Sequence, residues 1–235
     1  MIDHSLWAEI LARHLITDAD GVNRFAYGDV TEDDSIALDR YLQQLADTPI
    51  SSHNRPTQMA YWINLYNALT VRVILDHYPT DSIRDIDISP GLFSDGPWGK
   101  KLLTIEGEKV ALDDIEHQIL RPIWKDPRIH YAVNCASIGC PNLQPVPFEP
   151  DMLDRQLDGA AIEFVNHQRA VDIVGNNVIV SSIYSWFRDD FGKSDSDVLA
   201  HLKAYLSPER AMKLEDYTSI HDDVYDWRLN DPSNR

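Results

Sequence analysis

The chain has 235 residues, of which 43% are hydrophobic, and a formal net charge of −17 from 21 basic and 38 acidic side chains. This length allows one sizeable domain whose hydrophobic core needs no disulfide framework. The negative charge argues against nucleic acid or an anionic membrane surface as a partner, because both would repel the protein. No segment reaches the roughly 18 apolar residues of a membrane span, and the first residues lack the layout of a secretory signal, so we predict no membrane insertion.

Two short amphipathic helices are predicted within residues 4–48. Apolar side chains recur with a helical period in each of them. The first set is Trp7, Ile10, Leu11 and Leu15, and the second is Leu38, Tyr41, Leu42 and Leu45. Between the two helices, residues 21–30 (GVNRFAYGDV) have the composition of an extended stretch.

The clearest helix signal lies in residues 57–79 (TQMAYWINLYNALTVRVILDHYP), which end at Pro79. This helix is apolar on almost all sides, as is typical of a buried helix. Asn64 and Asn67 interrupt one face, with Tyr66 between them. Buried amides must be hydrogen-bonded, so the two asparagines either fix the backbone of a neighbouring loop or line a binding cleft.

Residues 90–101 (PGLFSDGPWGKK) form a loop rich in glycine and proline. Long loops of this kind usually serve a site, so we expect this one to border the main pocket, with Trp98 as an aromatic wall. The next segment, residues 102–112, predicts a hairpin that turns near Glu106 and Gly107.

Residues 112–124 (LDDIEHQILRPIW) predict a helix that carries Glu116, His117 and Arg121. One interpretation is a structural pair of Glu116 and Arg121 beside a satisfied histidine. The other interpretation makes His117 a catalytic base and Glu116 its orienting partner, although neighbouring helical residues point about 100° apart.

Both cysteines fall within residues 128–143 (RIHYAVNCASIGCPNL). The apolar run predicts a strand, on which His130 and Cys135 are five positions apart and point to opposite faces. Cys140 follows in a turn before Pro141. A catalytic thiol needs a base within hydrogen-bond reach, whereas the alternatives are a buried core cysteine or a disulfide between the two. We expect free thiols, with a histidine ring next to Cys135 or Cys140.

The rest of the chain predicts a proline-rich connector at residues 141–150, a helix at 151–168, a strand running into a helix at 176–186, and further short helices. No repeat or linker divides the sequence. We therefore predict one α+β domain over residues 1–235, with helices packed on a small antiparallel sheet and a flexible tail at residues 231–235.

Several long motifs follow one another in a defined order. They are AYWINLYNALTV, LDDIEHQILR, DPRIHYAVNCASIGCPNL, a late DDF and a closing YDWRLN. In this order the chain resembles the bacterial members of the domain of unknown function family 547, from about Trp7 to Asn230. That family is distantly similar to papain-like and transglutaminase-like cysteine enzymes, which implies a papain-like core. Its members are often exported by bacteria, which implies a periplasmic or secreted location. The resemblance names no reaction.

The residues and the resemblance together predict a thiol-dependent hydrolase or acyl-transferase that acts on an amide or ester bond. Cys135, with Cys140 as the second choice, attacks the carbonyl, and His117 or His130 takes and returns the proton. Backbone amides or Asn64 hold the oxyanion. The predicted binding residues are Asn64, Tyr66, Asn67, Trp98 and Arg121. We expect a small-molecule or peptide substrate and no cofactor.

Two other functions fit the same residues. A non-catalytic binding module would use an aromatic cleft built from Trp62, Tyr66, Trp98 and Trp186. A zinc protein would use His117, His130, Cys135 and Cys140, which are chemically sufficient ligands although their spacing matches no zinc motif.

Overall fold

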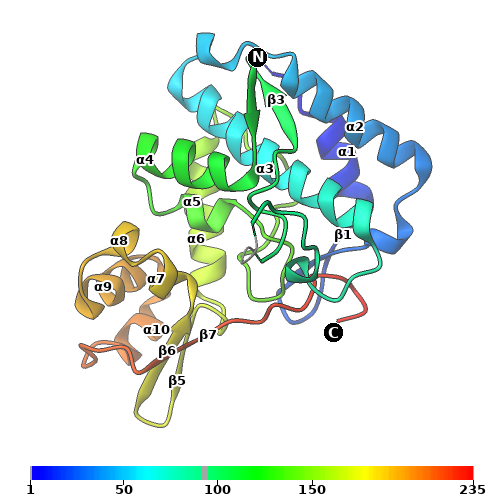
Figure 1. Cartoon of the computed structure of the whole chain (residues 1–235). Helices are drawn as coiled ribbons and strands as arrows, with labels where there is room; N and C mark the ends of the chain where they lie inside the picture. The colour runs from blue at the N-terminus through cyan, green and yellow to red at the C-terminus, as the bar shows by residue number, and fades with distance from the viewer. Residues whose placement is uncertain (1, 92–94, 235) are drawn as a thin grey trace.

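The long helix α3 (Arg55–His77) lies at the centre of the computed structural model, which describes residues 2–91 and 95–234 (Figure 1). The side chain of Asn54 starts this helix by accepting a hydrogen bond from the Thr57 amide, with Pro56 in the first turn. The helix is buried on nearly all sides because other elements surround it. It organises the first of two hydrophobic clusters.

The first cluster is built mainly from the first two thirds of the chain. Its helices and strands are α1 (Ser5–His14), β1 (Leu15–Thr17), β2 (Asn23–Phe25), α2 (Glu32–Ala46), α3, β3 (Leu103–Ile105), β4 (Glu108–Val110), the π-helix η4 (Asp114–Leu120), α4 (Arg121–Trp124) and α5 (Ile129–Ala132). Short 3₁₀ turns lie at Tyr27–Asp29, Ile50–Ser52 and Ile83–Asp85.

The second cluster is built from the last third of the chain. Its elements are α6 (Leu153–Val165), β5 (Val171–Val174), β6 (Asn177–Ser181), α7 (Ile183–Trp186), α8 (Arg188–Phe191), α9 (Asp195–Tyr205), α10 (Pro208–Lys213) and β7 (Asp222–Val224). Strand β6 pairs antiparallel with β5 and parallel with β7, so this sheet is mixed. In the described residues the other strands form two separate antiparallel pairs, β1–β2 and β3–β4. The helices therefore pack around three small sheets rather than on one.

Helix α6 joins the two clusters into a single α+β domain. Its first turns place Leu153 and Leu157 in the first cluster, and its last turns place Phe164 and Val165 in the second. Figure 1 shows α6 running between the two parts, and the C-terminal segment returning from β7 toward β1. The papain-like core expected from the resemblance is not confirmed by this architecture.

The structure confirms most of the predicted elements and corrects one near the cysteines. Helices α1, α2, α3 and α6 and the β3–β4 hairpin lie where the sequence predicts them. The predicted strand at residues 129–137 (IHYAVNCAS) is wrong, because Ile129–Ala132 form the short helix α5 and a loop follows. A short apolar run does not distinguish a buried strand from a buried helical turn, and α5 is buried at the junction of both clusters.

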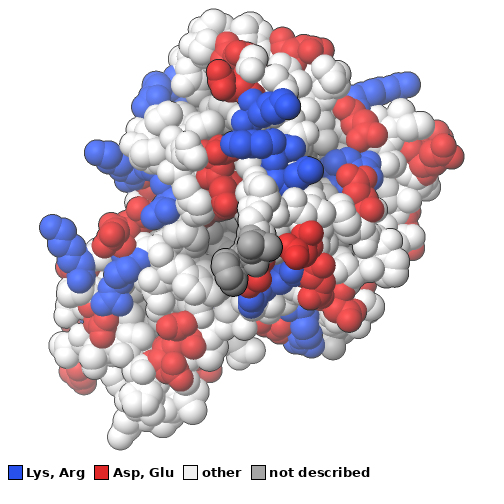
Figure 2. Space-filling model, in the orientation of Figure 1, with Lys and Arg blue, Asp and Glu red and all other residues white. Residues whose placement is uncertain are grey.

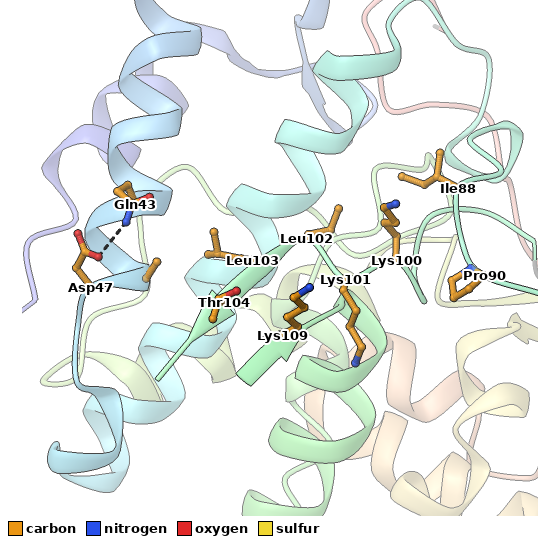
Figure 3. A pocket seen from close by; sticks show the side chains of 11 residues that line it. Gln43, Asp47, Ile88, Pro90, Lys100, Lys101, Leu102, Leu103, Thr104 and Lys109 are labelled. Atoms are coloured by element: carbon orange, nitrogen blue, oxygen red, sulfur yellow. Dashed lines mark hydrogen bonds between the residues drawn. The ribbon is translucent and has the colours of Figure 1, made fainter. Parts of the chain in front are cut away.

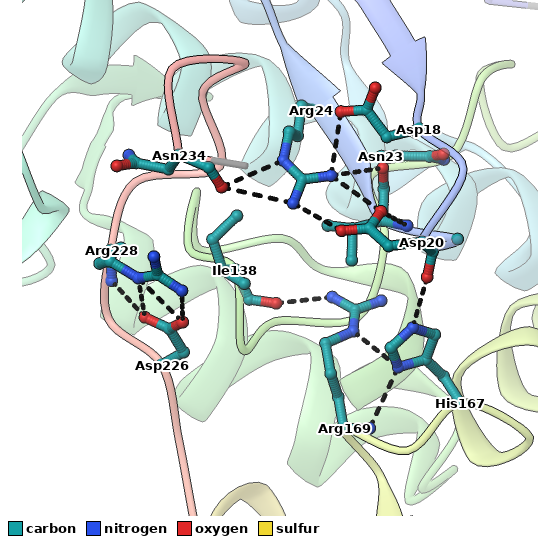
Figure 4. Close-up of polar contacts among 12 residues, drawn as sticks. Asp18, Asp20, Asn23, Arg24, Ile138, His167, Arg169, Asp226, Arg228 and Asn234 are labelled. Carbon is teal, nitrogen blue, oxygen red and sulfur yellow. Dashed lines mark hydrogen bonds and ion pairs between the residues drawn. The ribbon is translucent and has the colours of Figure 1, made fainter.

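The C-terminal tail makes hydrogen bonds with the body of the protein, and its expected flexibility stays a prediction. Asp231 is buried and accepts a hydrogen bond from the Tyr78 hydroxyl. The carbonyl of Asn234 accepts from the guanidinium of Arg24, as Figure 4 shows. Residue 235 lies outside the described residues. No helix in the described part of the chain is long and apolar enough to cross a membrane.

Candidate functional site

A cavity of about 190 Å³ lies at the junction of the two clusters and contains both cysteines in its wall. Elements from both parts of the fold contribute to it. The lining residues are Tyr66, Trp98, Asp113, Glu116, His117, His130, Val133, Cys135, Cys140, Pro141, Ile183, Trp186, Phe187, Tyr225 and Trp227. Seven of the predicted site residues meet here, whereas Asn64, Asn67 and Arg121 do not line the cavity.

Cys135 has three polar side-chain neighbours in this wall. Its Sγ lies 3.1 Å from the Sγ of Cys140, 2.9 Å from the hydroxyl of Tyr225 and 3.3 Å from the Oγ of Ser137. The Ser137 and Tyr225 hydroxyls are themselves 2.8 Å apart. Both thiols are free in the structure, and Cys135 is half-buried while Cys140 is buried.

These neighbours make the two thiols chemically unequal. The hydrogen bond from Cys140, followed by those from Ser137 and Tyr225, lowers the pKa of Cys135 although burial opposes the shift. Burial raises the pKa of Cys140 well above its ordinary value. Burial also raises the pKa of Tyr225, so its hydroxyl stays protonated and can donate to a Cys135 thiolate. Cys135 is the thiol that ionises first.

The loop that carries the cysteines is hydrogen-bonded to the backbone of the C-terminal segment. The amides of Ile138 and Gly139 donate to the carbonyls of Arg228 and Asp226. Ala136, directly after Cys135, has a φ of 56°. A residue with a side chain is costly in this left-handed region, and such positions concentrate at functional sites.

Arg169 fixes the turn between the two cysteines from the side of the second cluster. Its guanidinium donates to the carbonyl of Ile138 at 2.6 Å, which Figure 4 shows, and to the carbonyl of Cys140 at 2.8 Å. The side chain is oriented in turn by His167, whose Nδ1 accepts from the arginine Nε at 3.2 Å. The position of Cys140 therefore depends on contacts far away in the sequence.

A partly buried network of alternating charges lines the same cavity as the cysteines. The Nε2 of His130 is 2.7 Å from Asp190, and its Nδ1 is 3.6 Å from the buried Glu116. Asp190 also accepts a hydrogen bond from Arg121. The ring of His130 stacks on Phe187, with the ring centroids 4.1 Å apart. Both nitrogens of His130 thus face carboxylates rather than a sulfur.

The network favours a protonated His130. Although burial opposes the shift, the interactions with Asp190 and Glu116 raise the pKa of His130. Burial raises the pKa of Asp190, but the hydrogen bonds from His130 and Arg121 outweigh burial and lower this pKa to about 2. His130 lies between two carboxylates that favour its protonated form, and its role as the base for Cys135 stays a prediction.

His117 lies at the rim of the cavity, where it is exposed. Its Nδ1 is 3.0 Å from the guanidinium of Arg121, and its Nε2 is 3.7 Å from Asp113. Within the described residues no histidine hydrogen-bonds to either sulfur, although His117 and His130 line the same cavity. The predicted pair of Glu116 and Arg121 is not formed, because Arg121 binds Asp190 instead.

The two asparagines of α3 act behind the cavity wall. Asn67 donates to the carbonyl of Ala132 and accepts from the amide of Asn134, at 2.9 and 2.8 Å. Asn64 makes the same pair of bonds with the carbonyl and amide of Phe148. The prediction that both are buried and hydrogen-bonded is confirmed, and they fix loop backbone rather than line the cleft.

Aromatic side chains form the outer wall of the cavity. Trp227 stacks on Trp186 with centroids 5.4 Å apart, and it contacts Trp98 edge-on at 5.9 Å. Trp98 lines the same cavity as both cysteines, so the expectation that its loop borders the pocket is confirmed for this residue, while residues 92–94 lie outside the described part. Trp62 is buried against Tyr61 and does not line the cavity.

The four ligands of the zinc alternative line one cavity without forming a metal site. In the described ranges no group of three or more histidine, cysteine, aspartate or glutamate side chains is placed to hold a metal ion. His117 and His130 are turned toward Arg121 and Asp190 instead. The zinc reading therefore receives no support from the geometry.

A larger hollow of about 860 Å³ lies elsewhere, between the end of α2 and the β3–β4 hairpin (Figure 3). Lys100, Lys101 and Lys109 border it, and Figure 2 shows basic side chains grouped over this hairpin with acidic ones beside them. Its described lining residues include no cysteine or histidine. We therefore place the candidate site in the smaller cavity.

Comparison with known proteins bears on the segment that carries the cysteines. The family model described as "Protein of unknown function, DUF547" matches residues 50–165. The match supports the DUF547 family. Neither the curated proteins nor the solved structures gave a match. The DUF547 segment contains Glu116, His130, Cys135 and Cys140, but the likeness to papain-like and transglutaminase-like enzymes stays a prediction.

Three residues of the site were missed by the sequence reasoning. Ser137 and Tyr225 contact Cys135, and Asp190 contacts His130. Asp190 and Tyr225 belong to the late DDF and YDWRLN motifs, which lie beyond the DUF547 match. The only sequence signal for Asp190 and Tyr225 was that DDF and YDWRLN belong to the ordered series of motifs. The residue spacing within these two motifs does not indicate that they contact His130 or Cys135.

Proposed function

We propose that this protein is a thiol-dependent hydrolase or acyl-transferase whose nucleophile is Cys135. The observation that supports the proposal is the half-buried Cys135 sulfur in the wall of a cavity, with hydrogen-bond donors that lower its pKa. The thiolate, not the thiol, attacks a carbonyl, so such donors increase the fraction of reactive sulfur near neutral pH. The likeness to papain-like and transglutaminase-like enzymes forms part of this proposal.

Cys135 gives its proton to solvent rather than to a histidine. The hydroxyls of Ser137 and Tyr225 form a short chain that ends at the sulfur. When the thiolate attacks, these hydroxyls hold the developing charge. Tyr225 then donates its proton to the leaving group and regains one from solvent. The protonated His130 contributes positive charge to the same cavity and stays paired with its two carboxylates.

The cavity walls indicate the kind of acyl group that fits. Trp98, Trp186 and Trp227 present aromatic surface, and Ile183 and Val133 add apolar surface. A cavity of about 190 Å³ accepts a small group rather than a folded partner. We therefore expect a small apolar or aromatic acyl group, carried as an ester, thioester or amide.

The test is turnover of a small aryl ester by the reduced protein. Wild type should release the phenol and carry a transient acyl group on Cys135, detectable by mass spectrometry of the quenched reaction. Cys135→Ala should lower the rate by on the order of 10³-fold, because the nucleophile is lost. Iodoacetamide should also alkylate Cys135 far faster than free cysteine near neutral pH. Equal turnover by wild type and Cys135→Ala would overturn the proposal.

The aromatic wall supports one other function, a binding module without catalysis. Tyr66, Trp98 and Trp186 line the cavity together with Tyr225 and Trp227, whereas Trp62, the fourth residue of that predicted cleft, does not. Small aromatic acids titrated into the protein would then quench tryptophan fluorescence. Quenching that persists in Cys135→Ala, without ester turnover in wild type, would favour the binding module.

A further inference from the structure

We infer that Cys135 and Cys140 form a thiol–disulfide exchange pair, in which Cys135 attacks a small disulfide and Cys140 then closes an intramolecular Cys135–Cys140 bond. The two sulfurs are 3.1 Å apart and free. A disulfide bond is about 2.05 Å long, so closure needs a movement of only about 1 Å. Five residues of sequence separate the pair, and the turn between them already brings the sulfurs together.

The two thiols differ in access, which assigns their roles. Cys135 is half-buried and faces the cavity, whereas Cys140 is 5% exposed. An external disulfide therefore meets Cys135 first. Cys140 is shielded from that reagent but lies in contact with the sulfur that the reagent modifies, which is the arrangement of an attacking and a resolving thiol.

The loop geometry holds the pair ready for the second step. The Cys135 amide donates to the Cys140 sulfur at 3.1 Å, and the Cys140 amide donates to the Ser137 carbonyl at 3.1 Å. Arg169 binds the carbonyl of Cys140 from outside the loop. Groups held in contact in this way react as one molecule, with a high effective concentration of the attacking thiol.

The exchange is balanced in atoms and electrons. Cys135 gives its proton to solvent, and the thiolate attacks a disulfide RSSR, forming a mixed disulfide and releasing RS⁻, which takes up a proton. The sulfur of Cys140 then attacks the sulfur of Cys135, the bond to the SR group breaks, and the departing RS⁻ takes the proton of Cys140. The protein loses two electrons and two protons, and RSSR becomes two RSH.

The exchange itself does not depend on the proposed function, but its expected effect on ester turnover rests on that function. The Cys135–Cys140 bond occupies the sulfur that would attack an acyl group. Oxidation should therefore abolish ester turnover, and reduction by dithiothreitol should restore it. The cavity would then be active only where small thiols keep the pair reduced.

The experiment treats the reduced full chain with 2-hydroxyethyl disulfide, stops the reaction with iodoacetamide, and analyses the products by mass spectrometry. Wild type should become lighter by two hydrogen atoms and resist alkylation at both cysteines. Cys140→Ser should instead accumulate a mercaptoethanol adduct on Cys135. Cys135→Ser should leave Cys140 free, with reaction at least about tenfold slower than in wild type, because a buried thiol reacts poorly.

Two outcomes would overturn the inference. Either both thiols of wild type stay open to alkylation after prolonged treatment, or wild type keeps a stable adduct on Cys135 as Cys140→Ser does. The wild-type result decides even if a variant does not fold. Ester turnover by the same reduced sample separates the proposals. Turnover without disulfide closure contradicts only the exchange pair, and closure without turnover contradicts only the acyl chemistry.

Discussion

At the scale of single residues, two asparagine side chains hydrogen-bond to loop backbone in the way that a peptide group of a paired strand does. Asn67 offers one donor and one acceptor to Ala132 and Asn134, as a neighbouring strand would. Asn64 does the same for Phe148. A buried backbone group without a partner is costly, and neither loop pairs with a strand at these points. The polar interruption of an otherwise apolar helix thus shapes the backbone leading to Cys135.

Replacement of Asn67 by leucine should reduce the free energy of unfolding by at least about 2 kcal/mol. The leucine fits an apolar helix but leaves the Ala132 carbonyl and the Asn134 amide without partners, at a cost of about 1–3 kcal/mol each. Urea denaturation followed by circular dichroism measures the change. Asn177→Leu, at an exposed position at the start of β6, is the control and should stay within about 0.5 kcal/mol of wild type. Equal losses in both variants would contradict the assigned role.

The burial of these asparagines could be predicted from the sequence, whereas the partners of Cys135 could not. A helical period identifies a buried helix, and burial requires hydrogen bonds for any amide within it. The contact between Cys135 and Tyr225 spans 90 positions, and that between His130 and Asp190 spans 60. Residue spacing within an element carries no information about such contacts, which depend on how the last third of the chain packs against the DUF547 segment.

At the scale of elements, two segments differ in geometry from the prediction, namely the expected strand at residues 129–137 and the expected helix at residues 112–124. Helix α5 ends at Ala132, and the cysteines follow on a loop. The alternation of side chains between the two faces of a strand therefore does not predict where they point. The predicted helix begins as the π-helix Asp114–Leu120. Such segments are rare and occur mostly at functional sites, and sequence periodicity does not signal them. Residue types in the sequence therefore predict which side chains belong to the site, whereas the backbone conformation that carries them is not predicted.

The loop between the cysteines fits against the C-terminal segment only because residue 139 is glycine. A Cβ at this position would lie 2.7 Å from the backbone nitrogen of Asp226, closer than side-chain carbons approach. Gly139→Ala should therefore lower the free energy of unfolding by about 1–3 kcal/mol through overpacking. It should also slow alkylation of Cys135, because the loop must move away from Tyr225.

Gly159→Ala is the matched control for this substitution. Gly159 is exposed within α6, and a Cβ there meets nothing within 4 Å. Alanine is the better helix former, so this variant should gain about 0.5–1 kcal/mol and keep the wild-type alkylation rate. Thermal denaturation and timed iodoacetamide labelling measure both variants. A Gly139→Ala protein as stable and reactive as wild type would show that the close approach does not hold the loop.

At the scale of the whole molecule, ionic contacts join the two clusters around the cavity. Glu116 and Arg121 belong to η4 and α4, His130 to α5, and Asp190 to α8 in the second cluster. The chain carries a large excess of acidic groups, yet this network pairs two carboxylates with two cations. Breaking such a pair leaves an uncompensated charge. The protonation of His130 is therefore coupled to the packing of the second cluster against the first.

The pH dependence of stability should reveal this coupling. The pKa of His130 is raised in the folded protein, so its contribution is complete below the unfolded value of about 6.5 and is lost as the pH rises through the folded value. The pKa of Asp190 is lowered to about 2, so its contribution is complete above the unfolded value of about 3.9 and is lost as the pH falls toward that folded value. The network should therefore stabilise the protein most between about pH 4 and pH 6.5.

Asp190→Asn removes one anion of the network and should cost about 2 kcal/mol near the middle of this range, where hydrogen bonds to charged groups are lost. The difference from wild type should shrink toward alkaline pH, since His130 is then neutral in both proteins. Asp189→Asn, the exposed neighbour on α8, is the control and should follow the wild-type profile. Melting temperatures between acidic and alkaline pH measure all three proteins. A loss in Asp190→Asn that is the same at every pH would mean that the carboxylate supports packing without stabilising a charged His130.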